Sequence, residues 1–230
     1  MNRTRTFRTT AAALGVVGLV AGCATVASTW SSMTAPSSAE LDERADRMMK
    51  ASFRDQGIAK VDRLNQDLAN DACSDAAVTG KDVPEALAKR IEAENLKTIR
   101  APSDGRYLGD FRRGETIAQS GRGMTWTDAS TDPAANGGNC YNCHQLSKAE
   151  ISYGTIGPSL YNYGKLRGVT DPGSPAAKAM LEYTWGKLWN TRAYNACSNM
   201  PRFGHGGLLN EQQLKDLMAL LLDPKSPVNQ

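Results

Sequence analysis

The sequence predicts an all-α protein, and three observations lead to this prediction. Apolar residues recur every three to four positions in several segments, which is the spacing of one face of a helix. No segment of useful length alternates apolar and polar residues as a half-buried strand would. A capping pattern also opens the last apolar stripe, where Asn210 stands three residues ahead of Gln213.

Residues 1–22 have the pattern of an export signal. Three arginines precede the apolar run Ala11–Val20, which is too short to span a membrane as a stable helix. The segment ends on Ala21-Gly22-Cys23, which resembles a bacterial lipobox in which Cys23 is acylated and becomes the first residue of the mature chain. Ordinary cleavage nearby, for instance after Ala27, is the alternative and would release a soluble protein. Both routes predict a periplasmic location, the first with a lipid anchor.

The charge balance argues against one class of partner. The chain has 27 basic and 24 acidic residues, and three of the basic ones lie in the export segment, which holds no acid. Removal of that segment leaves 24 of each sign, so the mature chain is close to neutral. A neutral chain gives no electrostatic reason to expect nucleic acid or an anionic membrane surface as a partner.

Residues 39–103 are predicted to form a helical extension, after a flexible tether over 23–38 that is rich in Ser, Thr and Ala. A third helix of the extension opens at Pro84, a residue suited to a first turn, and Pro102 ends the region. We interpret the apolar stripes as packing faces. They are formed by Leu41, Ala45, Met48 and Met49, by Ile58, Val61, Leu64 and Leu68, and by Leu87, Ile91 and Leu96.

Residues 104–230 are predicted to form a second domain, which contains the strong chemical signals. Helices are expected at Phe111–Gln119, around Ala176–Trp189 and at Asn210–Leu222. A glycine-rich loop and a Cys-x-x-Cys-His motif lie between the first two of these helices.

The motif Cys140-Tyr141-Asn142-Cys143-His144 is the most specific of these signals. A thioredoxin-like redox pair would need a strand-to-helix junction, which this chain does not indicate. A zinc site needs about four ligands, and the remaining cysteines and histidine form no second pair. Covalent attachment of haem needs two thiols at this spacing, with His next, where a helix beginning at the motif aims the imidazole at the iron. The sequence therefore predicts one haem c, attached through Cys140 and Cys143, with His144 as an axial ligand.

The other axial ligand should be a methionine or a histidine. Met200 is favoured because Pro201-Arg202-Phe203 and then the terminal helix follow it. His205, the only other histidine, is the main alternative. Met218 lies on an apolar helix face, where methionine more often fills a core. Met124 and Met180 are less attractive, because the first precedes the haem motif and the second begins a helix.

Two segments resemble class I cytochromes c. Ile156-Gly157-Pro158-Ser159-Leu160 is similar to their Gly-Pro-x-Leu segment, and the residues from Met200 to Phe203 are similar to their distal Met-Pro-x-Phe. The resemblance implies a class I cytochrome c fold with an N-terminal helical extension. It also implies that the Pro158 carbonyl accepts a hydrogen bond from His144 and that Leu160 packs on the haem face. An ordinary loop with a turn proline is the alternative for the first segment. Ligation by His and Met leaves the iron no open position, so transfer of one electron is the expected activity.

Cys73 and Cys197 remain after the haem takes two of the five cysteines and the lipobox one. A disulfide between them would tie the extension to the loop that carries Met200, and it would stabilise the fold by about 4–5 kcal/mol on the chain-entropy model. Two unpaired buried thiols are the alternative. A catalytic thiol is disfavoured because no basic group or histidine stands beside either cysteine.

Three longer segments resemble the SoxX family, the monohaem subunits of the SoxAX cytochromes of the sulfur-oxidising system. The segments are Asn139–His144, Gly154–Gly164 and Cys197–His205. The ending Leu220–Asn229 and the extension around Ala51–Lys60 are similar to the longer-chain branch of that family. The resemblance runs from about residue 45 to the end of the chain.

This resemblance implies a heterodimer with a SoxA-like cytochrome subunit. SoxAX is an L-cysteine S-thiosulfotransferase, which joins thiosulfate oxidatively to a cysteine of the carrier SoxYZ and releases two electrons. The catalytic haem is expected on the SoxA partner. The present chain would accept the electrons and pass them to a small cytochrome c, with SoxYZ as a transient partner.

Two other functions stay open. A free-standing electron carrier would keep the haem chemistry without an obligate partner, although such a shuttle usually has a strongly charged docking face. A non-redox lipoprotein could instead use the haem as a structural element or a sensor, and an unusually low potential or ligand binding at the iron would indicate it.

Overall fold

The computed structural model describes residues 35–150 and 153–230. The export segment, Cys23 and most of the predicted tether lie outside the described residues. The all-α prediction is confirmed, because the described residues form helices and turns without a strand, apart from an isolated bridge between Gln56 and Ala59. The chain divides into two units, Met1–Arg54 and Asp55–Gln230. No helix within the described ranges is long and apolar enough to cross a membrane.

The described part of the first unit contains one helix, α2 (Ser38–Ser52). Ser37 and Glu40 cap its start reciprocally in a capping box, which satisfies two amides that a helix leaves unpaired. The helix buries none of its residues, and Leu41 and Met48 are 51% and 66% exposed. Among the described residues of this unit, the stripe that the sequence predicted as a packing face therefore has no packing partner.

The second unit begins with a correction to the predicted extension. One helical face was expected from Ile58 to Leu68, but Val61–Leu64 forms only a 3-10 turn, η1, and helix α3 spans Leu68–Thr79. The reason is Asp67, whose carboxylate accepts the Asn70 amide at 2.8 Å and so caps a new helix start. Helix α3 ends at Gly80, which has φ +67°.

Helix α4 (Glu85–Leu96) follows, with Pro84 at its N-cap rather than inside its first turn. Its Ile91 is 2% exposed and packs with Ala69 of α3 and with Ala196. This second cluster is small, so the extension buries little apolar surface of its own.

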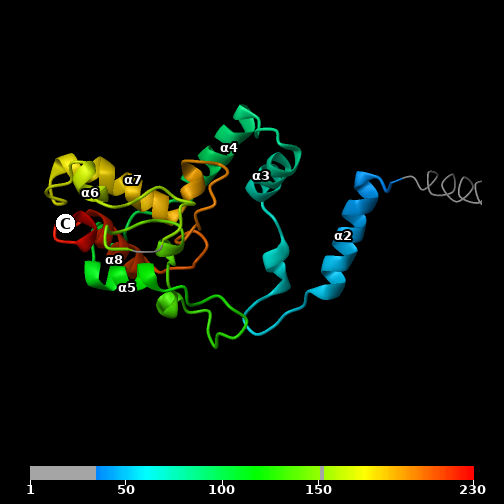
Figure 1. The fold of residues 1–230 in the computed structure, drawn as a ribbon, viewed down its shortest axis with the longest axis horizontal. Helices are drawn as coiled ribbons and strands as arrows, with labels where there is room; N and C mark the ends of the chain where they lie inside the picture. The colour runs from blue at the N-terminus through cyan, green and yellow to red at the C-terminus, as the bar shows by residue number, and fades with distance from the viewer. Residues whose placement is uncertain (1–34, 151–152) are drawn as a thin grey trace, which may run out of the picture. The chain divides into compact units, whose positions relative to one another are not determined.

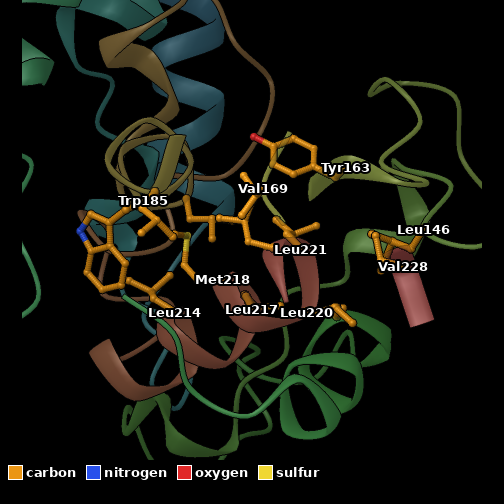
Figure 2. Packing of buried hydrophobic residues seen from close by; sticks show 14 of the residues in the cluster. Leu146, Tyr163, Val169, Trp185, Leu214, Leu217, Met218, Leu220, Leu221 and Val228 are labelled. Atoms are coloured by element: carbon orange, nitrogen blue, oxygen red, sulfur yellow. The ribbon is translucent and has the colours of Figure 1, made fainter. Parts of the chain in front are cut away.

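The main core is built around helix α8 (Glu211–Leu222), which lies between α5 (Phe111–Gln119) and α7 (Lys178–Trp189) in Figure 1. The predicted capping box is present, with Asn210 and Gln213 bonded reciprocally. Every residue of α8 from the third to the last is buried, and Figure 2 shows Leu214 and Met218 near Trp185 of α7.

Helices α5 and α8 approach closely at a glycine. A Cβ on Gly114 would lie 2.1 Å from the Asp216 backbone oxygen, so no side chain fits there. The buried Asp216 carboxylate also accepts hydrogen bonds from Arg113 Nε at 2.9 Å and from the Asp110 amide at 2.8 Å. Short elements complete the unit, namely α6 (Tyr163–Leu166) and the 3-10 turns at Pro133–Ala135, Cys140–Asn142, Pro175–Ala177, Thr191–Ala193 and Pro227–Asn229.

Candidate haem site

The Cys-x-x-Cys-His motif forms one tight turn, η3 (Cys140–Asn142). Asn139 opens it in the left-handed conformation, with φ +53°. The Cys140 carbonyl accepts from the amides of Cys143 at 3.0 Å and His144 at 2.9 Å. The turn thus keeps both thiols and the imidazole within five consecutive residues on one short loop.

The α-helix expected to begin at the motif is absent, and the neighbouring loop supplies the reason. A helix needs the carbonyls of its first turn for its own amides. Here the Tyr141 carbonyl accepts from the Gly154 amide at 3.1 Å, and the Cys143 carbonyl accepts from the Gly157 amide at 2.9 Å. Because the loop takes these acceptors, the motif stops after one 3-10 turn.

The same loop holds the imidazole of His144. The His144 Nδ1 atom lies 2.6 Å from the Pro158 carbonyl oxygen, which is the contact that the class I resemblance implied. A carbonyl can only accept, so Nδ1 carries the proton and Nε2 keeps its lone pair for a metal. A Cβ on Gly157 would lie 2.1 Å from His144 Cε1, so the backbone of the loop lies directly against the ring.

Neither motif thiol is in a disulfide, and both residues are half-buried. Cys140 packs against the main core, as does Leu160. Burial raises the pKa of the Cys140 thiol to about 12, so it is a neutral thiol at any physiological pH. An apolar wall beside a neutral thiol suits bonding to an apolar macrocycle better than it suits thiolate catalysis.

Trp189 provides a second test of whether haem fits this unit. The Trp189 indole N–H is buried without a hydrogen-bond partner among the described residues. The ring stacks on Trp185 at 6.0 Å between centroids, and a Cβ on Gly204 would lie 2.6 Å from it. A buried donor without a partner costs about 1–3 kcal/mol, and a haem carboxylate is an acceptor that would satisfy it. The donor set and this orphaned N–H therefore fit a haem. Sequence reasoning missed Trp189, because nothing in the pattern separates it from the other three tryptophans.

Met200 lies between two fixed points of the chain. Phe203, three residues later, is 4% exposed in the main core, and Cys197, three residues earlier, is in a disulfide. Met200 itself is partly buried and packs against the same core cluster as Cys140 and Leu160. Its amide donates to Ser198 Oγ at 3.3 Å.

The alternative ligands lie in different settings. Met218 is fully buried inside α8, where it fills the core. Met124 is in the left-handed conformation, and its carbonyl accepts from Arg63. Met180 packs on the main core from α7. His205 is exposed, and partial burial and the Arg202 charge lower its pKa. The haem roles of Cys140, Cys143, His144 and Met200 stay predictions.

Cys73 of α3 and Cys197 form a disulfide in the structure, with an S–S distance of 2.00 Å and 5.5 Å between the Cα atoms. A network of ion pairs that the sequence did not indicate also joins the start of α3 to the region around Cys197. Asp67 pairs with Arg192 at 2.8 Å and with Arg202 at 2.7 Å. Its partners are more than a hundred residues away in the chain, so no local pattern could predict them.

The structure also bears on the zinc alternative for the motif. In residues 35–150 and 153–230, no three His, Cys, Asp or Glu side chains gather in a way that could hold a metal ion. The motif therefore lacks the additional ligands that a tetrahedral zinc site needs there.

Comparison with known proteins agrees with the geometry. The family model described as "Cytochrome c" matches residues 134–224, which include the motif, the Pro158 loop, the Met200 segment and α8. A curated protein of Aquifex aeolicus (strain VF5), described as "Uncharacterized lipoprotein", is 35% identical over 167 residues, which cover 71% of this chain and 73% of that protein.

Proposed function

We propose that this chain, which belongs to the cytochrome c family and so transfers electrons through a covalently bound haem c, is the electron-transfer subunit of a SoxAX-type complex. The observation that carries the proposal is a pair of segments that contain or hold the two predicted ligands. Gly154–Gly164 holds the His144 ring, and Cys197–His205 carries Met200 on the disulfide-bonded loop. Both segments are the ones that resemble SoxX.

Each residue has a defined task in this proposal. Cys140 and Cys143 would hold the haem as thioethers, and His144 and Met200 would ligate its iron. The Pro158 carbonyl keeps the proton on Nδ1 of His144 and so leaves the Nε2 lone pair for the iron. When bound, the haem supplies reversible one-electron transfer, with both axial positions filled by protein.

The chemistry of sulfur is assigned to the partner. Forming a cysteine S-thiosulfonate needs an activated centre, and the thiols of the described residues are poorly suited to that task. Cys140 and Cys143 would be taken up as thioethers to the haem, and Cys73 and Cys197 are joined to each other. A SoxA-like subunit would therefore do the chemistry on the SoxYZ cysteine. This chain would take the two electrons one at a time and pass them to a small cytochrome c.

The location is proposed to be the periplasmic face of a membrane. The Aquifex aeolicus relative is described as a lipoprotein, and Ala21-Gly22-Cys23 of this chain resembles a lipobox. Acylation of Cys23 would anchor the protein through the tether. Replacing Cys23 by alanine should move the holoprotein from the membrane fraction to the soluble fraction, while an unchanged distribution would argue against acylation.

The test of the proposal is purification of the tagged holoprotein from periplasmic and membrane fractions, with mass and optical spectra of what co-purifies. We expect a SoxA-like haem protein in stoichiometric amount. A lone monohaem protein would contradict the complex and favour the free-standing carrier.

The ligand assignment is tested in the same preparation. Met200→Leu should abolish the Met–iron charge-transfer band of the oxidised protein. Met180→Leu is the matched control, because Met180 also packs partly buried on the main core. A band that survives in Met200→Leu would overturn the assignment of Met200.

A further inference from the structure

The segment Cys197–Arg202 is attached to helix α3 at both of its ends. At one end Cys197 is bonded to Cys73 in the second turn of α3. At the other end Arg202 Nη1 lies 2.7 Å from Asp67 Oδ2, and Asp67 is the N-cap of the same helix. Met200 is enclosed between these two attachments.

Asp67 makes a second connection to the same region. Its other carboxylate oxygen lies 2.8 Å from Arg192 Nη1, and the Nη2 atom of Arg192 donates to Asn70, also in the first turn of α3. The side chains of Arg192 and Arg202 are 13% and 26% exposed and that of Asp67 is 41% exposed, so water screens these pairs only in part. Burial opposes ionisation of Asp67, but the Asn70 amide and Arg202 outweigh it and lower its pKa.

Apolar packing cannot replace these attachments. The cluster between α3, α4 and this region consists of Ala69, Ile91 and Ala196, with three partly buried neighbours. Two alanines and one isoleucine bury too little surface to hold a loop firmly. The position of the segment relative to α3 therefore depends on one covalent bond and one carboxylate.

We propose that α3 is a clamp on the Met200 loop, and that Asp67 and Arg202 are positioning residues that keep the Met200 sulfur on the haem iron. This inference rests on the Met200 ligation in the proposed function. It gives the N-terminal extension a role, which is to slow the opening of the axial position and so to keep the iron closed to outside ligands.

The test measures how fast imidazole binds to the iron of the oxidised holoprotein, because imidazole enters only when Met200 leaves. Asp67→Asn is the informative variant, since asparagine caps a helix as well as aspartate and removes only the charge. We expect imidazole to bind about threefold to tenfold faster, as two charge-assisted pairs are lost. When the pH is raised until the charge-transfer band is lost, the loss should also occur at a lower pH in Asp67→Asn than in wild type. Arg202→Lys, which keeps the charge, should fall between wild type and Arg202→Gln.

Glu85→Gln on α4 is the matched control, because the Glu85–Lys89 pair is exposed and lies outside the clamp. It should leave the imidazole rate at the wild-type value. A wild-type rate in both Asp67→Asn and Arg202→Gln would overturn the clamp, even if both variants melt at lower temperature. If Asp67→Asn does not accumulate as holoprotein, Arg202→Gln alone decides.

The experiments distinguish failure of the clamp from failure of the Met200 ligation or of the SoxAX-type complex. A charge-transfer band that persists in Met200→Leu refutes the ligand assignment, and the clamp with it. Absence of a SoxA-like partner refutes the complex but leaves the imidazole rates, and hence the clamp, as measured.

Discussion

Helices α8 and α3 are both twelve residues long and both contact the segments that build the site, yet they are held in different ways. Helix α8 buries ten of its residues, whereas α3 buries only Ala69. Helix α3 is instead held by a disulfide and by the Asp67 carboxylate. Apolar burial responds little to pH or reductants. A disulfide is broken by reductant, and an ion pair is lost when the pH protonates its carboxylate. Reductant should therefore loosen α3 without acting on α8, although α8 also contains the ion-paired Asp216 and Lys215.

Removing the disulfide should have the largest effect. The bond closes a sequence separation of 124 residues, and the chain-entropy model gives about 4–5 kcal/mol for such a loop. We expect the double variant Cys73→Ser, Cys197→Ser to lose about this free energy of unfolding in urea titrations. Wild-type protein in reductant should match the variant. A loss below about 1 kcal/mol in both would show that α3 does not depend on the bond.

Truncating α8 should have the next largest effect. Leu220 is 1% exposed, and Leu→Ala at such sites costs about 3–5 kcal/mol through lost burial and the cavity that remains. Leu166→Ala is the control, because Leu166 is 75% exposed and should cost less than about 0.5 kcal/mol. Relative to wild type in the same buffer, Leu220→Ala should lose the same unfolding free energy with and without reductant. The disulfide variant should differ from wild type only without reductant. Equal unfolding free energies for the two alanine variants would contradict the account of the core.

The sign of the change in unfolding free energy in Gly114→Ala tests the contact of α5 with α8. Helix propensity alone would make the change stabilising by about 1 kcal/mol. The new Cβ would meet the Asp216 backbone oxygen at 2.1 Å, so we expect a net loss of about 1–3 kcal/mol. Gly173→Ala, where the nearest heavy atom is a side-chain oxygen at 3.2 Å, is the control. A higher melting temperature for Gly114→Ala than for wild type would mean that α5 can move away from α8 at little cost in free energy.

Acid should weaken the attachment of α3 by protonating Asp67, and this change in stability should be the smallest of those predicted here. Although burial opposes it, the Asn70 amide and Arg202 lower the pKa of Asp67 in the folded protein. A lowered folded pKa contributes stability above the unfolded value of about 3.9, and this contribution is lost as the pH falls through the folded value. The difference in unfolding free energy between wild type and Asp67→Asn should therefore shrink as urea titrations move from pH 7 to below about pH 4. A constant difference would show that the carboxylate charge is not what matters.

The sequence predicted those elements whose determinants are local. Helix α5 was expected at the observed bounds, and the Asn210–Gln213 capping box fixed the start of α8. The motif, the Pro158 loop and Met200 could be named because haem attachment and the class I segments are written in short runs of residues. The structure brings the Pro158 carbonyl to His144 and places Met200 on the core beside which Cys140 also packs.

What the sequence did not predict depends on contacts distant in the chain. The expected helix at the motif is lost to the amides of Gly154 and Gly157, which take its carbonyls. The helix face expected from Ile58 is an exception with a local cause, because Asp67 caps a new start through the nearby Asn70 amide. The same carboxylate reaches Arg192, 125 residues away, and a single ion pair at that separation leaves no periodic trace.

The disulfide has a further consequence for the covalent architecture of the chain. The Cys140–His144 motif lies between Cys73 and Cys197, so the bond places the turn that is predicted to attach haem inside a closed ring of polypeptide. A single protease cut in the exposed loop around Trp126, which is 56% exposed, opens this ring without dividing the molecule. The two pieces stay linked through sulfur. Reductant then removes that covalent link and leaves only non-covalent contacts, such as that of α5 with α8, between the N-terminal piece and the C-terminal piece.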